Sequence, residues 1–117
     1  MFKAIACDPL AWNRSLLPNG EPKGIEYKII MDGEGGSPMI ILARYEPGWV
    51  EPRHRHAEDE TLFLVEGEIE VEGELHQAPS VVFVSRGTLY GPLTAGPNGV
   101  VFYRIGYNQR RPLAASA

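Results

Sequence analysis

The sequence predicts an all-β fold, either a closed barrel or a two-sheet jelly roll. The 13 glycines and 10 prolines are scattered between short apolar runs, which is typical of strands joined by turns. At least six such runs are present, and none shows the 3.6-residue period of an amphipathic helix. A closed barrel or a jelly roll protects the edge strands of such a chain, so we expect that architecture.

Length and composition bound the domain organisation. A chain of 117 residues can bury one hydrophobic core, so we expect a single domain over residues 1–117. Apolar residues make up 44% of the chain, which favours a globular over a disordered protein. Within this domain we expect an irregular N-terminal arm over residues 1–24, a barrel over residues 25–106 and a C-terminal tail over residues 107–117.

The charge and the chain's N-terminus argue against several kinds of partner. The formal net charge of -4 disfavours nucleic acid, because phosphate binding requires a basic patch. No signal sequence is visible, and no apolar run approaches the roughly 20 residues that a membrane span needs. The single cysteine, Cys7, cannot form an internal disulfide, and we expect a partly buried thiol. We therefore expect a cytoplasmic protein that binds neither nucleic acid nor a membrane.

The first half of the chain predicts an arm and a hairpin. Turn residues dominate residues 1–24, where Trp12 is expected to pack across a barrel face or onto a second subunit. Residues 25–31 and 39–45 read as two strands joined by a glycine-rich loop. Both faces of the second strand are apolar, which suits a strand covered on both sides. A barrel of this size provides limited cover, so we expect a symmetric homodimer.

The second half of the chain predicts four further strands. They are expected at residues 61–65, 68–72, 81–84 and 100–105, with a turn at residues 66–67. Glutamates alternate with apolar residues over the second of these strands. Ile69 and Val71 should therefore face the core, and the three glutamates should face the solvent.

Residues 48–67 hold the clearest chemical signal in the sequence. His54 and His56 are two residues apart, and side chains two apart on an extended strand point to the same face. Glu60 has the same parity and precedes an apolar run. Two imidazoles and one carboxylate form a facial set that suits Fe(II), Mn(II), Ni(II), Cu(II) or Zn(II) and leaves positions open for a substrate. The simpler alternative is a pair of surface histidines in a polar loop.

The full spacing of this stretch resembles the first motif of the cupin family. That motif has a glycine, five residues, His-x-His, three or four residues, a glutamate, six residues and a final glycine. Gly48, His54, His56, Glu60 and Gly67 occupy every position. The resemblance implies a cupin-type double-stranded β-helix, which is a jelly-roll barrel, with a metal site in its mouth.

A second cupin motif, roughly Pro-x-Gly-x-x-His, supplies a third histidine. The stretch that resembles it, residues 85–92, has Gly87 in place but Ser85 at the proline position and Tyr90 at the histidine position. Tyr90 could bind the metal as a phenolate or stand beside it as a neutral hydrogen-bond donor. His76 is a substitute ligand candidate, against the alternative of an exposed strand histidine.

The surroundings of both motifs resemble a small single-domain cupin branch. Trp12, residues 46–48 and residues 87–92 carry this likeness. The branch includes acetylacetone-cleaving and dihydroxyacetophenone-type dioxygenases and the cupin domains of anti-sigma regulators. The resemblance implies an oxygen-using dioxygenase that acts on a small diketone, hydroxyketone or phenolic substrate. Iron is the first expectation for the metal, with manganese, nickel, copper or zinc as alternatives.

Two arginines complete the expected site. Arg44 and Arg104 lie on predicted strands and could point inward to hold an anionic substrate, although arginines at such positions are more often ion-paired or exposed. Two other hypotheses remain open. The first is a non-catalytic barrel that binds a metal or a small ligand, and the second is an anti-sigma-like interaction module.

Overall fold

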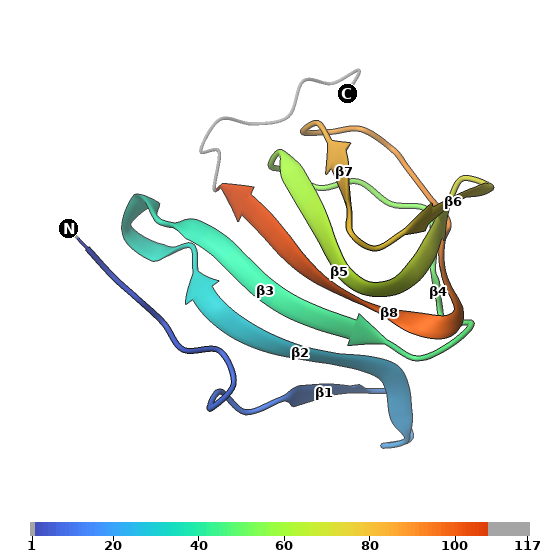
Figure 1. Ribbon diagram of the computed structural model, residues 1–117, viewed down its shortest axis with the longest axis horizontal. Coiled ribbons are helices and arrows are strands. Elements are labelled where there is room, and N and C mark those ends of the chain that lie inside the picture. Colours follow the sequence, from blue (N-terminus) through green and yellow to red (C-terminus); the bar gives the residue numbers. More distant parts are fainter. Residues whose placement is uncertain (1, 108–117) are drawn as a thin grey trace.

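The computed structural model describes residues 2–107 (Figure 1). Over this range the chain forms eight strands and one short 3-10 helix. In chain order these are β1 (Asn13–Leu16), β2 (Pro22–Asp32), η1 (Glu34–Gly36), β3 (Pro38–Tyr45), β4 (Val50–Glu51), β5 (Glu60–Val71), β6 (Glu74–Gln77), β7 (Ser80–Val84) and β8 (Leu93–Tyr107). The predicted strands at 25–31, 39–45, 81–84 and 100–105 are confirmed, each within a longer strand.

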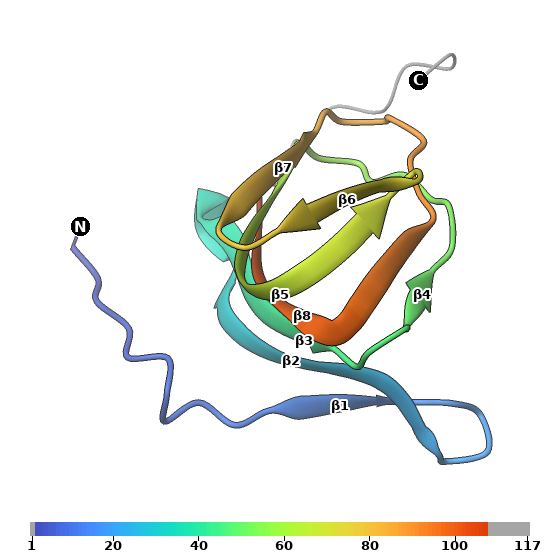
Figure 2. The ribbon, with the colours of Figure 1, turned by 45° about the vertical axis from the view of Figure 1, so that its right-hand side comes forward.

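The described strands form one antiparallel sheet that curves into a barrel. Its order is β1-β2-β3-β8-β5-β6, with β4 paired to β8 and β7 paired to β5. Figures 1 and 2 show β2, β3 and β8 as one wall of a cup and β5, β6 and β7 closing over it. The all-β jelly-roll prediction is therefore confirmed. The central strand β8 pairs with both β3 and β5, so residues on its concave face lie in the barrel interior.

The core follows the two-residue period of the strands. Leu62 and Leu64 of β5 are 1% and 0% exposed, whereas their neighbour Phe63 is 42% exposed. Phe102 of β8 and Ile69 are also fully buried. Burying each of these side chains contributes roughly 1.5–3 kcal/mol, so they hold the two walls of the barrel together.

Strand β5 corrects one prediction. The expected turn at residues 66–67 is absent, and a single strand runs through this point. Its pairing with β8 shifts between Leu64 and Glu66 and again between Gly67 and Ile69. Gly67 has a left-handed backbone (φ 76°), which allows the strand to bend sharply where it passes the backbone of Gly99. The glycine therefore marks a bulge, and the chain does not reverse there.

The same bulge explains a second correction. Ile69 faces the core as predicted, but Glu68 is not solvent-facing. It is 8% exposed, and its Oε1 accepts a hydrogen bond from the backbone N–H of Asn98 at 3.2 Å. The irregular register turns two consecutive side chains toward the protein, which strict alternation does not allow for.

The N-terminal segment is less irregular than predicted. β1 lies within it and pairs with β2, which itself begins at Pro22. Because β1 is short and mostly polar, its sequence gives no alternating signal. Trp12 packs across the barrel's outer face as expected, with the Arg44 guanidinium carbon 3.9 Å from its ring centre. Of the predicted tail, Tyr107 ends β8, and residues 108–117 lie outside the described residues.

Two predictions concern the surroundings of the chain. No helix within residues 2–107 combines the length and apolar character that crossing a bilayer requires. The expected homodimer stays a prediction, because one chain is described. Phe83 on β7 and Phe63 on β5 are 63% and 42% exposed, so the outer face of these strands carries apolar surface.

Candidate metal centre

The site is built where the segment after β4 crosses the segment before β8. His54 and Tyr90 form an antiparallel bridge, with N···O distances of 2.9 and 3.0 Å between their backbones. Paired residues in an antiparallel bridge send their side chains to the same side, and the two ring centres are 4.7 Å apart. The His56 ring is equally close to that of His54, at 4.7 Å. The backbone thus brings together three of the predicted site residues.

The His54 ring has the proton arrangement of a metal ligand. Its Nδ1 lies 2.7 Å from the carbonyl oxygen of Pro52. A carbonyl can only accept a hydrogen bond, so Nδ1 carries a proton, and Nε2 is the ring nitrogen left to bind a metal. A histidine whose far nitrogen is fixed by a backbone carbonyl is the usual arrangement around protein-bound metals.

His56 and Glu60 bring their polar atoms together beside Arg104. His56 Nε2 is 3.2 Å from Glu60 Oε2, close to the roughly 3 Å between adjacent ligand atoms on an ion with 2.0–2.2 Å bonds. Burial lowers the pKa of His56, and the charge of Arg104 acts in the same direction against the opposing effect of Glu60. His56 is therefore held in the neutral form that can bind a metal.

The Glu60 carboxylate supplies the best evidence that a cation fits here. Its side chain is 3% exposed, and Oε2 is buried without a hydrogen bond from any described residue. Arg104 Nε lies 2.9 Å from this oxygen, but its N–H does not point at it, so the contact is an ion pair without a hydrogen bond. A buried carboxylate oxygen without a donor is suited to a metal ion.

The tightest group of candidate ligand atoms includes a residue that the sequence analysis missed. One ligand atom each from His56, Glu58 and Glu60 lies within 4.8 Å of the others, and His54 is not in this group. Glu58 lies between His56 and Glu60 in the sequence, and this proximity is the signal that could have identified it. The structure therefore contains a candidate metal site of histidine and glutamate side chains, with His54 on its rim.

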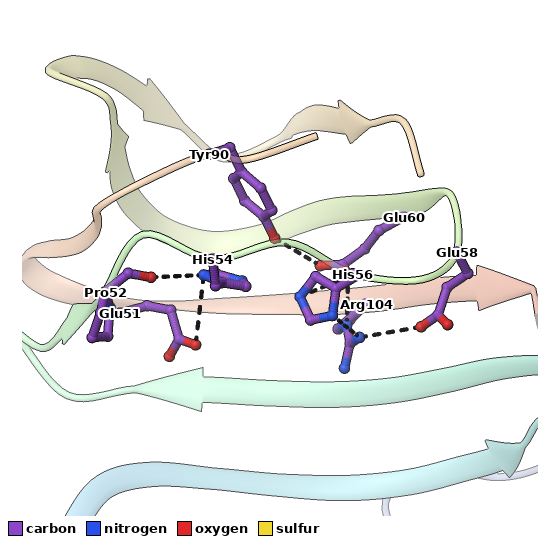
Figure 3. A network of polar contacts seen from close by, with 8 residues as sticks. All are labelled: Glu51, Pro52, His54, His56, Glu58, Glu60, Tyr90 and Arg104. Atoms are coloured by element: carbon purple, nitrogen blue, oxygen red, sulfur yellow. Dashed lines mark hydrogen bonds and ion pairs between the residues drawn. The ribbon is translucent and has the colours of Figure 1, made fainter. Parts of the chain in front are cut away.

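Tyr90 closes the other side of the site. Its hydroxyl donates a hydrogen bond to Glu60 Oε1 at 3.1 Å, and the residue is 4% exposed. Burial and the neighbouring Glu60 carboxylate raise the pKa of Tyr90 well above its usual value, so the phenol is protonated. Of the two predicted roles, this geometry favours the neutral hydrogen-bond donor over the phenolate ligand. Figure 3 shows Tyr90 reaching Glu60 from the side opposite Arg104.

The two predicted arginines have different positions. Arg104 projects from β8 into the site, where it contacts Glu60. The structure does not bring Arg44 there, because it lies on the other face of β3, pairs with Glu26 at 3.1 Å and stacks on Trp12. This corrects the Arg44 prediction: Arg44 pairs with Val101 in the β3–β8 register, and both residues lie outside the barrel.

Comparison with known families decides the identity of the fold. The family described as ChrR Cupin-like domain matches residues 4–106. The chain belongs to this cupin family. The predicted resemblance to small cupins is therefore confirmed. A search of curated proteins gives no match.

Solved structures agree on the cupin fold at low sequence identity. An acetylacetone dioxygenase from Acinetobacter johnsonii matches with a TM-score of 0.65 and 22% identity, over 99% of this chain and 79% of that chain. The polyketide cyclase RemF from Streptomyces resistomycificus matches with a TM-score of 0.74 and 19% identity, over 98% and 89%. A chain of the Rhodobacter sphaeroides complex of SigE with the anti-sigma ChrR matches with a TM-score of 0.66 and 17% identity, over 86% and 51%. This cupin spans about half of that last chain.

Two spaces lie at or next to the candidate metal centre of this cupin. A cavity of ≈70 Å³ is lined by the site residues and by apolar side chains such as Leu62 and Leu93. A second recess of ≈210 Å³ lies over β2 and β3 and is lined by Tyr27, Ile41 and Ala43, among others. Both spaces share Tyr45, Phe102 and Arg104. His76 lies on β6 opposite Ile69 and lines neither space, so it is not brought to the site.

The Tyr90→Phe variant tests whether the phenol is a hydrogen-bond donor or a ligand. We expect the variant to retain stoichiometric metal with an affinity about 10–100-fold weaker, because the phenol orients Glu60 without binding the metal itself. The loss of one hydrogen bond to a charged group should also lower the free energy of unfolding by about 1.5–3 kcal/mol. Metal titration and urea unfolding measure the two effects. Complete loss of metal would instead assign Tyr90 as a direct ligand.

Proposed function

We propose that this cupin is a metal-dependent dioxygenase acting on a small diketone, hydroxyketone or phenolic substrate. The observation that carries the proposal is the pair of imidazoles beside the buried Glu60 carboxylate, at the wall of a partly apolar cavity. His54, His56 and Glu60 would hold the metal, with Glu58 as an additional carboxylate. The likeness to a solved acetylacetone dioxygenase supports the reaction class.

Iron is the proposed metal, since two histidines and a carboxylate with open positions are typical of non-haem iron oxygenases. When bound, the metal supplies Lewis acidity to a chelating substrate and electrons to molecular oxygen. Manganese, nickel, copper and zinc share enough ligand preference to compete for these residues.

The chain's own residues would bind and orient the substrate. Arg104 lies 2.9 Å from Glu60 and lines the cavity, and it can pair with an enolate, phenolate or carboxylate oxygen. Leu62, Leu93 and Phe102 are 1–3% exposed and form the apolar part of the cavity wall, against which an apolar part of a substrate can pack. The ≈210 Å³ recess next to Arg104 has room for an apolar substituent.

Oxygen consumption tests this proposal directly. Protein loaded with Fe(II) under anaerobic conditions is mixed with aerated acetylacetone, benzoylacetone, hydroxyketones or phenols, and oxygen uptake is followed with an electrode. We expect stoichiometric uptake with at least one substrate class, and none with the His54→Ala/His56→Ala variant. Iron-loaded wild type that consumes no oxygen with the whole panel would contradict the dioxygenase.

A non-catalytic binding barrel is the second candidate. The position of Arg104 favours it, because the guanidinium lies against His56 and Glu60 and leaves only the ≈70 Å³ cavity beside them. In this case the protein would bind a metal or a small anion and release it unchanged. Tight binding of the diketones without any turnover, followed by calorimetry and product analysis, would favour this function.

A further inference from the structure

Arg104 contacts every member of the tightest ligand group. Its Nη2 donates to His56 Nδ1 at 3.1 Å and to Glu58 Oε1 at 3.4 Å, and its Nε lies 2.9 Å from Glu60 Oε2. The side chain is 24% exposed, so these contacts are only partly screened by water. Figure 3 shows the guanidinium on the side of the site that faces away from Tyr90.

The positive charge of the Arg104 guanidinium is unfavourable beside the ligand atoms once a divalent cation is bound there. The carboxylates of Glu51, Glu58 and Glu60 place three negative charges around the site, and Arg104 offsets one of them. The carboxylates attract a divalent cation, but the guanidinium among them repels it. At contact distances the repulsion between a divalent cation and a guanidinium weakens binding by about tenfold or more, even in the dielectric of water. Moving the guanidinium away from the ligand atoms should therefore strengthen metal binding.

The protonation of the His56 ring opposes a metal in the same way. A guanidinium can only donate, so His56 Nδ1 accepts and Nε2 carries the ring proton. Binding a metal through Nε2 requires the proton on Nδ1, which can then no longer accept from Arg104. Arg104 must give up this hydrogen bond before His56 can bind a metal through Nε2.

We infer that Arg104 makes the binding of a divalent metal and of a small monoanion at this site mutually dependent. A monoanion gives the displaced guanidinium a new partner. Arg104 lines both the ≈70 Å³ cavity and the ≈210 Å³ recess, so it can pair with an anion in the recess without leaving the barrel. The inference rests on the metal centre of the proposed function and adds that the anionic substrate stabilises that centre.

Mn²⁺ and benzoate are suitable probes, because benzoate is an anion with an apolar ring and binds free metal ions weakly. Mn²⁺ affinity is measured from the electron paramagnetic resonance signal of the free ion, with benzoate or with chloride at equal ionic strength. In the wild type we expect benzoate to lower the Mn²⁺ dissociation constant by at least about tenfold. By linkage, Mn²⁺ must strengthen benzoate binding by the same factor, which calorimetry checks independently.

Variants assign the coupling to Arg104. In Arg104→Met we expect Mn²⁺ to bind at least about tenfold more tightly than in the wild type when benzoate is absent, and benzoate to change this affinity less than about twofold. Arg104→Lys keeps the charge and should keep most of the coupling. Arg44→Met is the matched control, since Arg44 is outside the site, and its coupling should equal that of the wild type.

The outcomes separate this inference from the proposed function. Wild type that binds Mn²⁺ equally well with benzoate and with chloride would overturn the inference and leave the metal centre standing. Coupling that persists in Arg104→Met would also overturn it. If neither protein binds Mn²⁺ under any condition, the metal centre itself is wrong and the inference fails with it. Should Arg104→Met not fold, the wild-type linkage measurement decides.

Discussion

Replacing Glu60 by glutamine is expected to weaken divalent metal binding by more than about a hundredfold. That is the upper end of the loss for a residue that only orients a ligand, and a direct anionic ligand should exceed it. Glu60 is the one buried carboxylate of the candidate site. One of its oxygens lies next to His56, and the other accepts a hydrogen bond from Tyr90. The amide keeps nearly the same shape but has no charge to offset a cation.

The measurement is a Zn²⁺ or Mn²⁺ titration in competition with a chromogenic chelator. Glu66→Gln is the matched control, because it is the same substitution on the same strand at an exposed position. Arg104 keeps Glu58 as a partner in the Glu60→Gln variant, so we expect the variant to fold. Metal affinity within a few-fold of the wild type would exclude Glu60 as a ligand.

The Gly67→Ala variant is expected to lower the free energy of unfolding by at least about 3 kcal/mol. Gly67 has a left-handed backbone (φ 76°), where an L-residue costs about 1–2 kcal/mol. A Cβ at this position would also collide with the carbonyl oxygen of Gly99. The Cβ would be attached directly to the β5 backbone, and the oxygen belongs to the backbone of its paired strand β8. The collision is therefore relieved only by moving one of these strands.

Gly73→Ala separates the two contributions to this effect. Gly73 is also left-handed (φ 85°), but a Cβ there would meet nothing within 4 Å. Its cost should therefore be the conformational 1–2 kcal/mol alone. Urea unfolding followed by circular dichroism gives both values. Equal losses in the two variants would show that the contact with Gly99 does not constrain the barrel.

The sequence predicted most of the candidate site because its residues are local. His54, His56 and Glu60 lie within seven residues of one another, so the sequence could predict that they lie close together. The structure places His54 and His56 in the connection between β4 and β5, so this proximity, not a shared strand face, accounts for their position. Glu58 lies in the same connection and was overlooked because the family motif does not contain it. The all-β class followed from the turn residues and the short apolar runs.

What could not be predicted depends on the register between strands. Arg44 and Arg104 both lie in apolar runs, and only the β3–β8 pairing shows that one faces outward and the other inward. The bulge at Gly67 likewise depends on how β5 passes β8, since a glycine after a glutamate reads equally well as a turn. The candidate ligands could thus be predicted from residues close together in the sequence. The positions of the two arginines and of the bulge depend on pairing between strands that are far apart in the sequence.

Elemental analysis of the protein purified without chelator tests the central claim most directly. Wild type is compared with the His54→Ala/His56→Ala variant after both are shown to be folded. We expect close to one divalent transition-metal ion per chain in the wild type and essentially none in the variant. A wild type that remains free of metal after incubation with iron, manganese and zinc, or a variant that retains it fully, would contradict the metal centre.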